Sequence, residues 1–188
     1  MADKHALFWL PNALTLARCA LAGGVAWLIL TAPIGSIWPL IAYVGVAMTD
    51  FVDGFAARRL NAVSSFGAFL DPVADKLLVG ACLIALTILR DYGLLLLIPT
   101  AAIVTRDVIA TSLRLVPGIS MPVSQLAKWK TGIEMVAIAG LLLALALGSA
   151  ILWNMGLILI WLAATLAVYT LGLYIGTLIP NQNDRANT

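Results

Sequence analysis

The sequence predicts an all-α membrane protein with six transmembrane helices. Of its 188 residues, 62% are hydrophobic and only 11% are charged, and the mean hydropathy is +1.03. A soluble domain is typically about 45–50% apolar and about 25% charged. The apolar residues fall into six stretches, each near the roughly 20 residues that cross a bilayer. A water-soluble fold of this length could not bury so much apolar surface, so lipid is the expected solvent.

The six expected helices form one domain over residues 1–188, and each is bounded by residues that break a helix or carry charge. The first ends at Ala32-Pro33, since proline interrupts a helix. The third ends before the charged pair Arg90-Asp91. In chain order, the helices are expected at about residues 10–31, 38–58, 66–89, 94–114, 131–148 and 151–179.

Three segments outside these helices are less apolar. Residues 1–9 mix charge with Leu7, Phe8 and Trp9, which predicts either a short interfacial helix or a frayed terminus. Residues 115–130 hold two prolines, a glycine and polar residues, and are expected to form a cytoplasmic loop. Residues 181–188 are polar and are expected to form a flexible tail.

Basic residues gather at alternate ends of the expected helices, and an excess of Lys and Arg marks the cytoplasmic side of a membrane protein. Arg90 is the basic residue at the opposite ends, where the connections at 31–37 and 148–150 carry no charge. Both termini are therefore expected to face the cytoplasm, as six spans require. The residues at the cytoplasmic ends are Lys4, His5, Arg58, Arg59, Arg114, Lys128, Lys130 and Arg185.

Four aspartates stand near the expected cytoplasmic ends of the second and third helices, in the segment DFVDGFAARRLNAVSSFGAFLDPVADK. Asp50 and Asp53 are three residues apart, and Asp71 and Asp75 are four apart, so each pair shares a helical face. A short loop joins the two helices. The resulting hairpin can bring all four carboxylates together.

Placing four neighbouring carboxylates in membrane helices costs free energy. An aspartate at the bilayer centre costs roughly 2.5–3.5 kcal/mol on insertion scales, and like charges disfavour one another's ionisation. Hard divalent cations prefer carboxylate oxygens, and two such ions would neutralise four charges. Two neighbouring ions also suit displacement at phosphorus, because they stabilise both the attacking and the leaving oxygen. The alternative is a structural salt-bridge network with Arg58, Arg59 and Lys76.

Small residues lie on the same helical faces as the aspartates, at Gly54, Ala57 and Gly67. Glycine weakens a helix by about 1 kcal/mol relative to alanine, so its presence needs a reason. It would let a flat or bulky ligand approach the backbone. Ordinary small-residue packing between membrane helices is the alternative.

The pattern Asp50-x2-Asp53-Gly54-x2-Ala57-Arg58-x8-Gly67-x3-Asp71-x3-Asp75 resembles, without a departure, the signature of the CDP-alcohol phosphatidyltransferase family. The resemblance implies a six-helix membrane enzyme, often a homodimer, that moves a phosphatidyl group from a CDP-linked lipid to an alcohol and releases CMP. It also implies two divalent cations, Mg²⁺ or Mn²⁺. By the resemblance, Asp50, Asp53 and Asp71 are metal ligands, Asp75 is a metal ligand or the catalytic base for the acceptor hydroxyl, and Gly54, Ala57, Arg58 and Gly67 line the CDP site.

A second group of residues is expected to bind the acceptor. Arg106 lies within an apolar span, where an arginine needs an anionic partner. Asp107 adjoins it but points about 100° away around a helix, which predicts a poor partner. A substrate phosphate is expected instead, because guanidinium binds phosphate through two hydrogen bonds; snorkelling or pairing with Glu134 are the alternatives. The expected phosphate-binding residues are Arg106, Arg114, Lys128 and Lys130, and for the last three the alternative is topology-setting charge.

Three sequence segments, at residues 10–18, 66–76 and 126–131, are similar to the bacterial phosphatidylglycerophosphate synthases of this family. They imply CDP-diacylglycerol as donor, sn-glycerol 3-phosphate as acceptor and a bacterial inner membrane. Those synthases typically carry Arg-Glu where this chain has Arg106-Asp107, a pair similar to that of the cardiolipin synthases, whose acceptor is phosphatidylglycerol. The stretch Thr111-Ser112-Leu113-Arg114 favours the first assignment, and cardiolipin synthesis is the alternative.

Asn12 and Thr15, near the cytoplasmic end of the first helix, could contact the nucleotide or lipid phosphates, although Asn12 could equally cap a helix. A rival function of another class is a cation transporter that uses the aspartates as its ion site. Transporters usually place such acids near the midplane on broken helices, whereas here they lie at the cytoplasmic ends and no inverted repeat appears. A net charge of only +2 does not indicate nucleic-acid binding.

Overall fold

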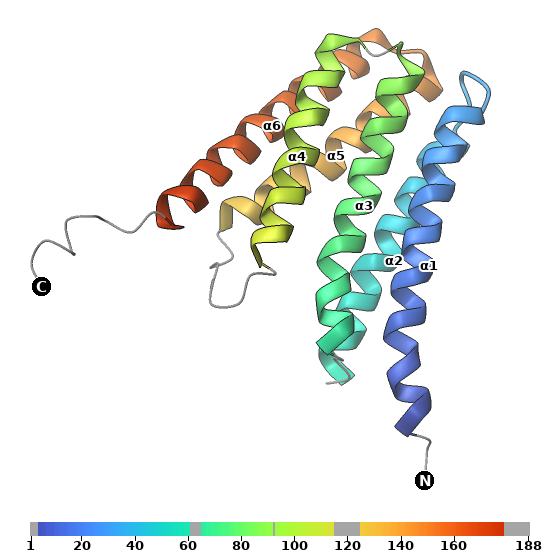
Figure 1. Cartoon of the computed structure of the whole chain (residues 1–188). Helices are drawn as coiled ribbons and strands as arrows, with labels where there is room; N and C mark the ends of the chain where they lie inside the picture. The colour runs from blue at the N-terminus through green and yellow to red at the C-terminus, as the bar shows by residue number, and fades with distance from the viewer. Residues whose placement is uncertain (1–3, 61–64, 92, 115–124, 179–188) are drawn as a thin grey trace, which may run out of the picture.

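The computed structural model describes the backbone of residues 4–60, 65–91, 93–114 and 125–178, and the side chains within 17–49, 76–91, 93–113 and 129–176. In these ranges the chain forms six helices that run up and down in succession (Figure 1). They are α1 (Lys4–Thr31), α2 (Trp38–Leu60), α3 (Ser65–Leu89), α4 (Leu94–Arg114), α5 (Gln125–Leu147) and α6 (Ala150–Leu178).

The helices alternate in direction, so that α1, α3 and α5 begin at the lower end of the view in Figure 1, where α2, α4 and α6 finish. We call this the polar end of the bundle. At the opposite end the chain reverses through residues with positive φ, Gly35 (87°), Asp91 (53°) and Gly148 (63°). Glycine adopts this left-handed conformation without strain and aspartate tolerates it, which permits tight connections.

The core is formed mainly by the middle turns of the helices. Leu83 and Leu86 of α3, Ile138 and Leu141 of α5 and Ile160 of α6 are fully buried. The pairs α5–α6 and α1–α3 pack most extensively, while α4 packs on α6 and α3. This packing brings α3, α4, α5 and α6 together around one polar cluster, described below.

Three helices carry apolar stretches long enough to cross a membrane within the described residues, at Leu94–Leu113, Trp129–Leu147 and Ala150–Gly176. The described parts of α1, α2 and α3 add shorter apolar stretches. The expected all-α class and membrane character are therefore confirmed. The number of six membrane spans stays a prediction.

Two boundaries differ from those expected. The chain is helical from Lys4 and continuous with the first span, so Lys4–Trp9 is not a frayed end, and its position at the membrane interface stays a prediction. The expected loop at 115–130 is wrong for its last part, because α5 begins at Gln125. The residues after Pro122 include Gln, Leu, Ala and Lys, which are good helix formers, so the helix begins soon after the proline. Residues 115–124 and 181–188 lie outside the described part of the chain.

Candidate active site

The four predicted metal ligands lie on helical backbone next to the polar end. Asp50 and Asp53 are in the last part of α2, and Asp71 and Asp75 are in the first part of α3. The expected helical spacing of each pair is therefore present, and both pairs belong to the ends at which these helices meet (Figure 1).

Their side chains lie outside the described residues, so the metal site itself stays a prediction. Within the described side chains, no group of three or more His, Cys, Asp or Glu residues could hold a metal ion. Eight further predicted positions also lie outside the described side chains, and their roles stay predictions: Asn12, Thr15, Gly54, Ala57, Arg58, Gly67, Arg114 and Lys128.

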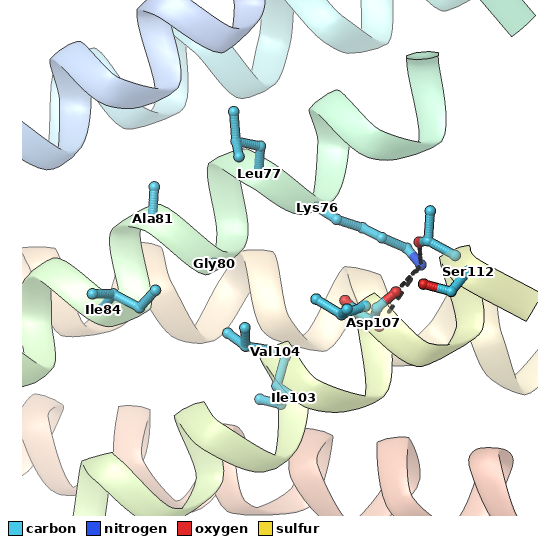
Figure 2. Close-up of a pocket in the computed structure, with 11 residues that line it drawn as sticks. Lys76, Leu77, Gly80, Ala81, Ile84, Ile103, Val104, Asp107 and Ser112 are labelled. Atoms are coloured by element: carbon cyan, nitrogen blue, oxygen red, sulfur yellow. Dashed lines mark hydrogen bonds and ion pairs between the residues drawn. The ribbon is translucent and has the colours of Figure 1, made fainter. Parts of the chain in front are cut away.

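Lys76 is the first residue after the predicted aspartates whose side chain the structure describes, and it reaches from α3 to α4 (Figure 2). Its Nζ donates to the backbone carbonyl of Asp107 at 3.3 Å and to Oγ1 of Thr111 at 3.0 Å. The Asp107 Oδ1 atom lies 4.0 Å from the same nitrogen. Lys76 therefore couples the helix that carries Asp71 and Asp75 to the helix that carries Arg106.

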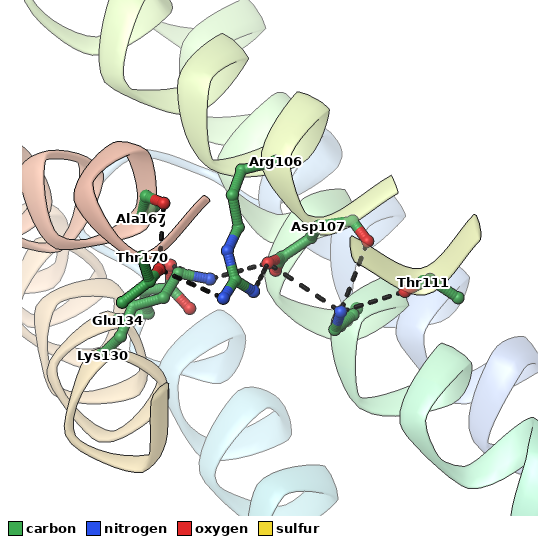
Figure 3. A network of polar contacts seen from close by, with 8 residues as sticks. Arg106, Asp107, Thr111, Lys130, Glu134, Ala167 and Thr170 are labelled. Carbon is green, nitrogen blue, oxygen red and sulfur yellow. Dashed lines mark hydrogen bonds and ion pairs between the residues drawn. The ribbon is translucent and has the colours of Figure 1, made fainter. Parts of the chain in front are cut away.

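Asp107 is the centre of the polar contacts at this end of the bundle (Figure 3). Its Oδ1 accepts hydrogen bonds from Nη1 of Arg106 at 2.9 Å and from Nζ of Lys130 at 2.8 Å. Lys130 also contacts Oε1 of Glu134, one turn along α5, at 2.9 Å. We refer to Lys76, Arg106, Asp107, Lys130, Glu134 and Thr170 as the Asp107 cluster.

Arg106 extends from α4 towards α6. Its Nη2 donates to Oγ1 of Thr170 at 3.2 Å, and its guanidinium carbon lies 5.7 Å from the centroid of the Tyr174 ring. Its Nε is buried and has no hydrogen-bond acceptor among the described residues. The guanidinium is thus held by residues of α4 and α6, and its Nε donor stays unused.

The expectation that Asp107 is a poor partner for Arg106 is wrong. Adjacent residues do project in different directions from a helix, but the arginine side chain is long, and both side chains turn into the space between α4 and α5. There Lys130 shares the Asp107 carboxylate, which adds a reason for Arg106 to reach it. The alternative of a direct Arg106–Glu134 pair is not among the ion pairs of the described residues.

Apart from Lys76, whose side chain is 24% exposed, the Asp107 cluster is deeply buried. Arg106 is 5% exposed, Asp107 7%, and Lys130 and Glu134 1% each. Buried charges are costly unless they are paired and hydrogen-bonded, and removing one partner typically destabilises a protein by about 3–5 kcal/mol. Among the members of this cluster, the cationic side chains of Lys76, Arg106 and Lys130 outnumber the two carboxylates. The arrangement therefore suits an anionic ligand.

Sequence reasoning overlooked Thr170 and treated Lys76 only as a possible partner of the aspartates. A spacing of four residues could have found Thr170, because it recurs in the apolar helices: Asp107 and Thr111, Lys130 and Glu134, and Thr170 and Tyr174. Residues four apart share a helical face. The pairing of these faces across helices depends on helix rotation, which the spacing does not give.

The sequence matches the family of CDP-alcohol phosphatidyltransferases over residues 8–169. It is 39% identical to the CDP-diacylglycerol–glycerol-3-phosphate 3-phosphatidyltransferase of Rickettsia bellii, over 86% of this chain and 90% of that protein. The protein of the same name from Rickettsia felis is 38% identical over 86% of this chain and 90% of its own length. A cardiolipin synthase (CMP-forming) of Oryza sativa subsp. japonica is 35% identical over 89% of this chain and 56% of that protein.

The family match covers most of the chain, including the segment with the four aspartates and the described members of the Asp107 cluster up to Glu134. This match favours an enzyme that transfers a chemical group over the alternative of a cation transporter. The chain belongs to the CDP-alcohol phosphatidyltransferase family and is a membrane enzyme of that class.

Proposed function

We propose that this enzyme transfers the phosphatidyl group of CDP-diacylglycerol to sn-glycerol 3-phosphate and releases phosphatidylglycerophosphate and CMP. The observation that carries the proposal is similarity over nearly the whole length to proteins that bear this activity in their names, such as the Rickettsia bellii protein. The Asp107 cluster supports it, because an acceptor that bears a phosphate needs cationic partners.

The family is generally dependent on divalent cations. We assign two Mg²⁺ or Mn²⁺ ions to Asp50, Asp53, Asp71 and Asp75. The residues fit such ions in donor chemistry, since carboxylate oxygens are preferred ligands of hard cations, and in helical spacing on α2 and α3. When bound, the ions would neutralise charge on the diphosphate and on the departing CMP.

The remaining chemistry falls to side chains of this chain. The hydroxyl oxygen of the acceptor forms a bond to the phosphatidyl phosphorus. Asp75 would accept the proton that this hydroxyl loses. The bond from that phosphorus to the CMP oxygen breaks, and CMP departs with the electron pair. The CDP moiety would be bound by Gly54, Ala57, Arg58 and Gly67, with Asn12 and Thr15 contacting its phosphates.

The phosphate of the acceptor is assigned to Arg106, Arg114, Lys128 and Lys130. Arg106 and Lys130 are engaged with Asp107, so they would share their positive charge between that carboxylate and the phosphate. The Nε of Arg106, a buried donor without an acceptor among the described residues, would be available for a hydrogen bond to the phosphate. Arg114 is the last residue of α4 and Lys128 lies in the first turn of α5, so both stand at the polar end.

Cardiolipin synthesis is the second candidate, favoured by similarity to the rice protein of that name. The acceptor would then be phosphatidylglycerol, which is itself a lipid. Both candidates share the donor and the metal site and differ in the acceptor.

We further propose that the enzyme lies in a bacterial cytoplasmic membrane, as a homodimer, with both termini and the polar end facing the cytoplasm. The names of bacterial relatives and the basic residues at the polar end support this placement. Labelling of cysteines introduced at positions 4 and 36 of the chain in intact cells tests the orientation. Protection of position 4 and modification of position 36 by an impermeant thiol reagent is the expected result.

The activity is tested with the purified full-length protein, CDP-diacylglycerol, Mg²⁺ and either glycerol 3-phosphate or phosphatidylglycerol. We expect CMP release with glycerol 3-phosphate alone. CMP release with phosphatidylglycerol alone would establish the second candidate, and no CMP with either acceptor would refute both. Lys128→Gln should raise the KM for glycerol 3-phosphate and leave the KM for CDP-diacylglycerol unchanged, whereas Arg90→Gln, at the opposite end, should change neither.

A further inference from the structure

Pro99 lies inside α4 and is fully buried. In an α-helix each carbonyl accepts a hydrogen bond from the N–H four residues later, and proline has no N–H. The carbonyl of Leu95 therefore lacks the donor that α4 would otherwise supply. Leu95 is 66% exposed and belongs to an apolar stretch long enough to cross a membrane. In lipid, such a carbonyl has to find its donor within the protein.

The missing donor comes from α6. Nε1 of Trp161 donates to the carbonyl oxygen of Leu95 at 2.9 Å. Trp161 belongs to the apolar stretch Ala150–Gly176, where an indole N–H likewise needs an acceptor within the protein. This one hydrogen bond therefore satisfies a polar group on each of two apolar helices, and it joins α4 to α6.

A second hydrogen bond joins the same two helices nearer the polar end, from Nη2 of Arg106 to Oγ1 of Thr170 at 3.2 Å. The helices α4 and α6 run in the same direction (Figure 1). Along the helix axis, Leu95 and Arg106 are roughly 16 Å apart, and Trp161 and Thr170 roughly 14 Å. Because these separations are similar, α4 is attached to α6 at two levels, which fixes how far along α6 it lies.

The attachment at Leu95 also bears on the direction of Arg106. The residues from Leu95 to Arg106 make about three turns, so these two lie within roughly 20° of the same face of α4. The backbone between them belongs to one continuous helix, Leu94–Arg114. A rotation or shift of α4 at Leu95 would therefore move the face that carries Arg106.

We propose that Trp161 is a positioning residue: its hydrogen bond to the carbonyl of Leu95 holds α4 on α6 so that the guanidinium of Arg106 faces the phosphate of the acceptor alcohol. This assignment rests on the proposed function, which gives Arg106 that ligand. Trp161 lies nearer the opposite end than Thr170, the α6 partner of Arg106, so it acts through α4 and not on the substrate.

A variant at Trp161 is expected to fold, because α4 also has a buried attachment to α3. Oγ1 of Thr87 and Oγ1 of Thr100 lie 3.3 Å apart. Thr87 donates its proton to the carbonyl of Leu83 at 2.8 Å, so Thr100 is the donor between the two hydroxyls. Loss of the indole N–H therefore loosens α4 from α6 without releasing it from the bundle.

The first test removes the indole N–H in two ways, by Trp161→Phe and by replacement of Trp161 with 3-benzothienylalanine, which keeps the shape of the ring system. We expect both to raise the KM for glycerol 3-phosphate by roughly fivefold and to leave the KM for CDP-diacylglycerol within about twofold of the parent. Trp27→Phe, at a residue 65% exposed on α1, should change neither KM. Equal rises in both KM values, or no rise in either, would overturn the proposal.

The second test separates the hydrogen bond from packing of the ring. Pro99→Ala returns a backbone N–H to the carbonyl of Leu95, so in that background loss of the indole N–H leaves this carbonyl with a donor. Trp161→Phe should therefore lower the Tm by less in Pro99→Ala than in the parent. An equal loss of Tm in both backgrounds would show that Trp161 acts by packing and would overturn the proposal.

The third test needs no turnover. Spin labels on Val108→Cys of α4 and Val168→Cys of α6, both exposed positions, report the distance between the helices in a cysteine-free background diluted with unlabelled chains. Trp161→Phe should shift or broaden the distance distribution, and Trp27→Phe should not. An unchanged distribution in Trp161→Phe would overturn the proposal. If the parent releases no CMP with any alcohol, the proposed function fails, while this distance still decides whether Trp161 holds α4.

Discussion

At the polar end of the bundle, Arg106, Asp107, Lys130 and Glu134 are buried against one another, whereas at the opposite end Arg90 and Asp91 are exposed. The polar end joins four helices through charged hydrogen bonds. The opposite end is closed by short connections and apolar packing. Among the described side chains, the buried charges thus gather at the end where the proposed function requires an anionic substrate to bind.

The largest effect is expected at the predicted catalytic base. Asp75→Asn should lower the rate of CMP release by about 10²–10⁴-fold, the usual contribution of a positioned general base. Binding of CDP-diacylglycerol and thermal stability should change little. Asp91→Asn, at the opposite end, is the matched control, since asparagine also tolerates positive φ. Full activity of Asp75→Asn would remove the assignment of Asp75 as the base.

The next largest effect concerns the Asp107 cluster. Asp107→Ala should lower the free energy of unfolding by about 3–5 kcal/mol, because Arg106 and Lys130 lose a shared carboxylate while they remain buried. Reversible denaturation in detergent measures this change. The exposed neighbour Val108, replaced by alanine, serves as control. A loss no larger than that of Val108→Ala would show that the cluster is not held together by Asp107.

A smaller effect is expected from packing near the opposite end. A Cβ at Gly156 of α6 would lie 2.7 Å from Cδ2 of Leu141, a fully buried residue of α5. Gly156→Ala should therefore destabilise the protein by about 1–3 kcal/mol. Gly172→Ala, where nothing lies within 4 Å, should not destabilise it. Adding Leu141→Ala to Gly156→Ala should remove the overlap, and a strictly additive double variant would argue against this contact.

The smallest effect is expected at Arg90, whose guanidinium carbon lies 4.2 Å from the centroid of the Trp153 ring. An exposed cation–π contact contributes about 0.5–1 kcal/mol, so Arg90→Ala should reduce stability by no more than this. Catalytic constants should be unchanged, because Arg90 follows the last residue of α3, Leu89, at the end opposite the polar end. A strong loss of activity in Arg90→Ala would contradict the division between the two ends.

The helices could be predicted because apolar length and helix breakers act locally. Pro33 and the pair Arg90-Asp91 gave the ends of two helices correctly. The start of α5 was missed because the polar composition of Gln125–Lys130 was interpreted as loop, although those residues form helix readily. Polarity alone does not separate a loop from the exposed end of a membrane helix.

The candidate site was only partly accessible from the sequence. The spacing of the four aspartates predicted a shared helical face for each pair, and α2 and α3 have that helical spacing. The contacts of Arg106 with Asp107 and Thr170 could not be predicted, because they depend on how α4, α5 and α6 are rotated against one another.

The aspartate site is tested most directly by counting bound Mn²⁺ in the purified enzyme with CDP-diacylglycerol present, by electron paramagnetic resonance. Two Mn²⁺ ions per chain are predicted for the parent and for Asp91→Asn, with loss of bound Mn²⁺ in Asp53→Asn and Asp71→Asn. Unchanged Mn²⁺ binding in both of these variants would contradict the assignment of the ions to α2 and α3.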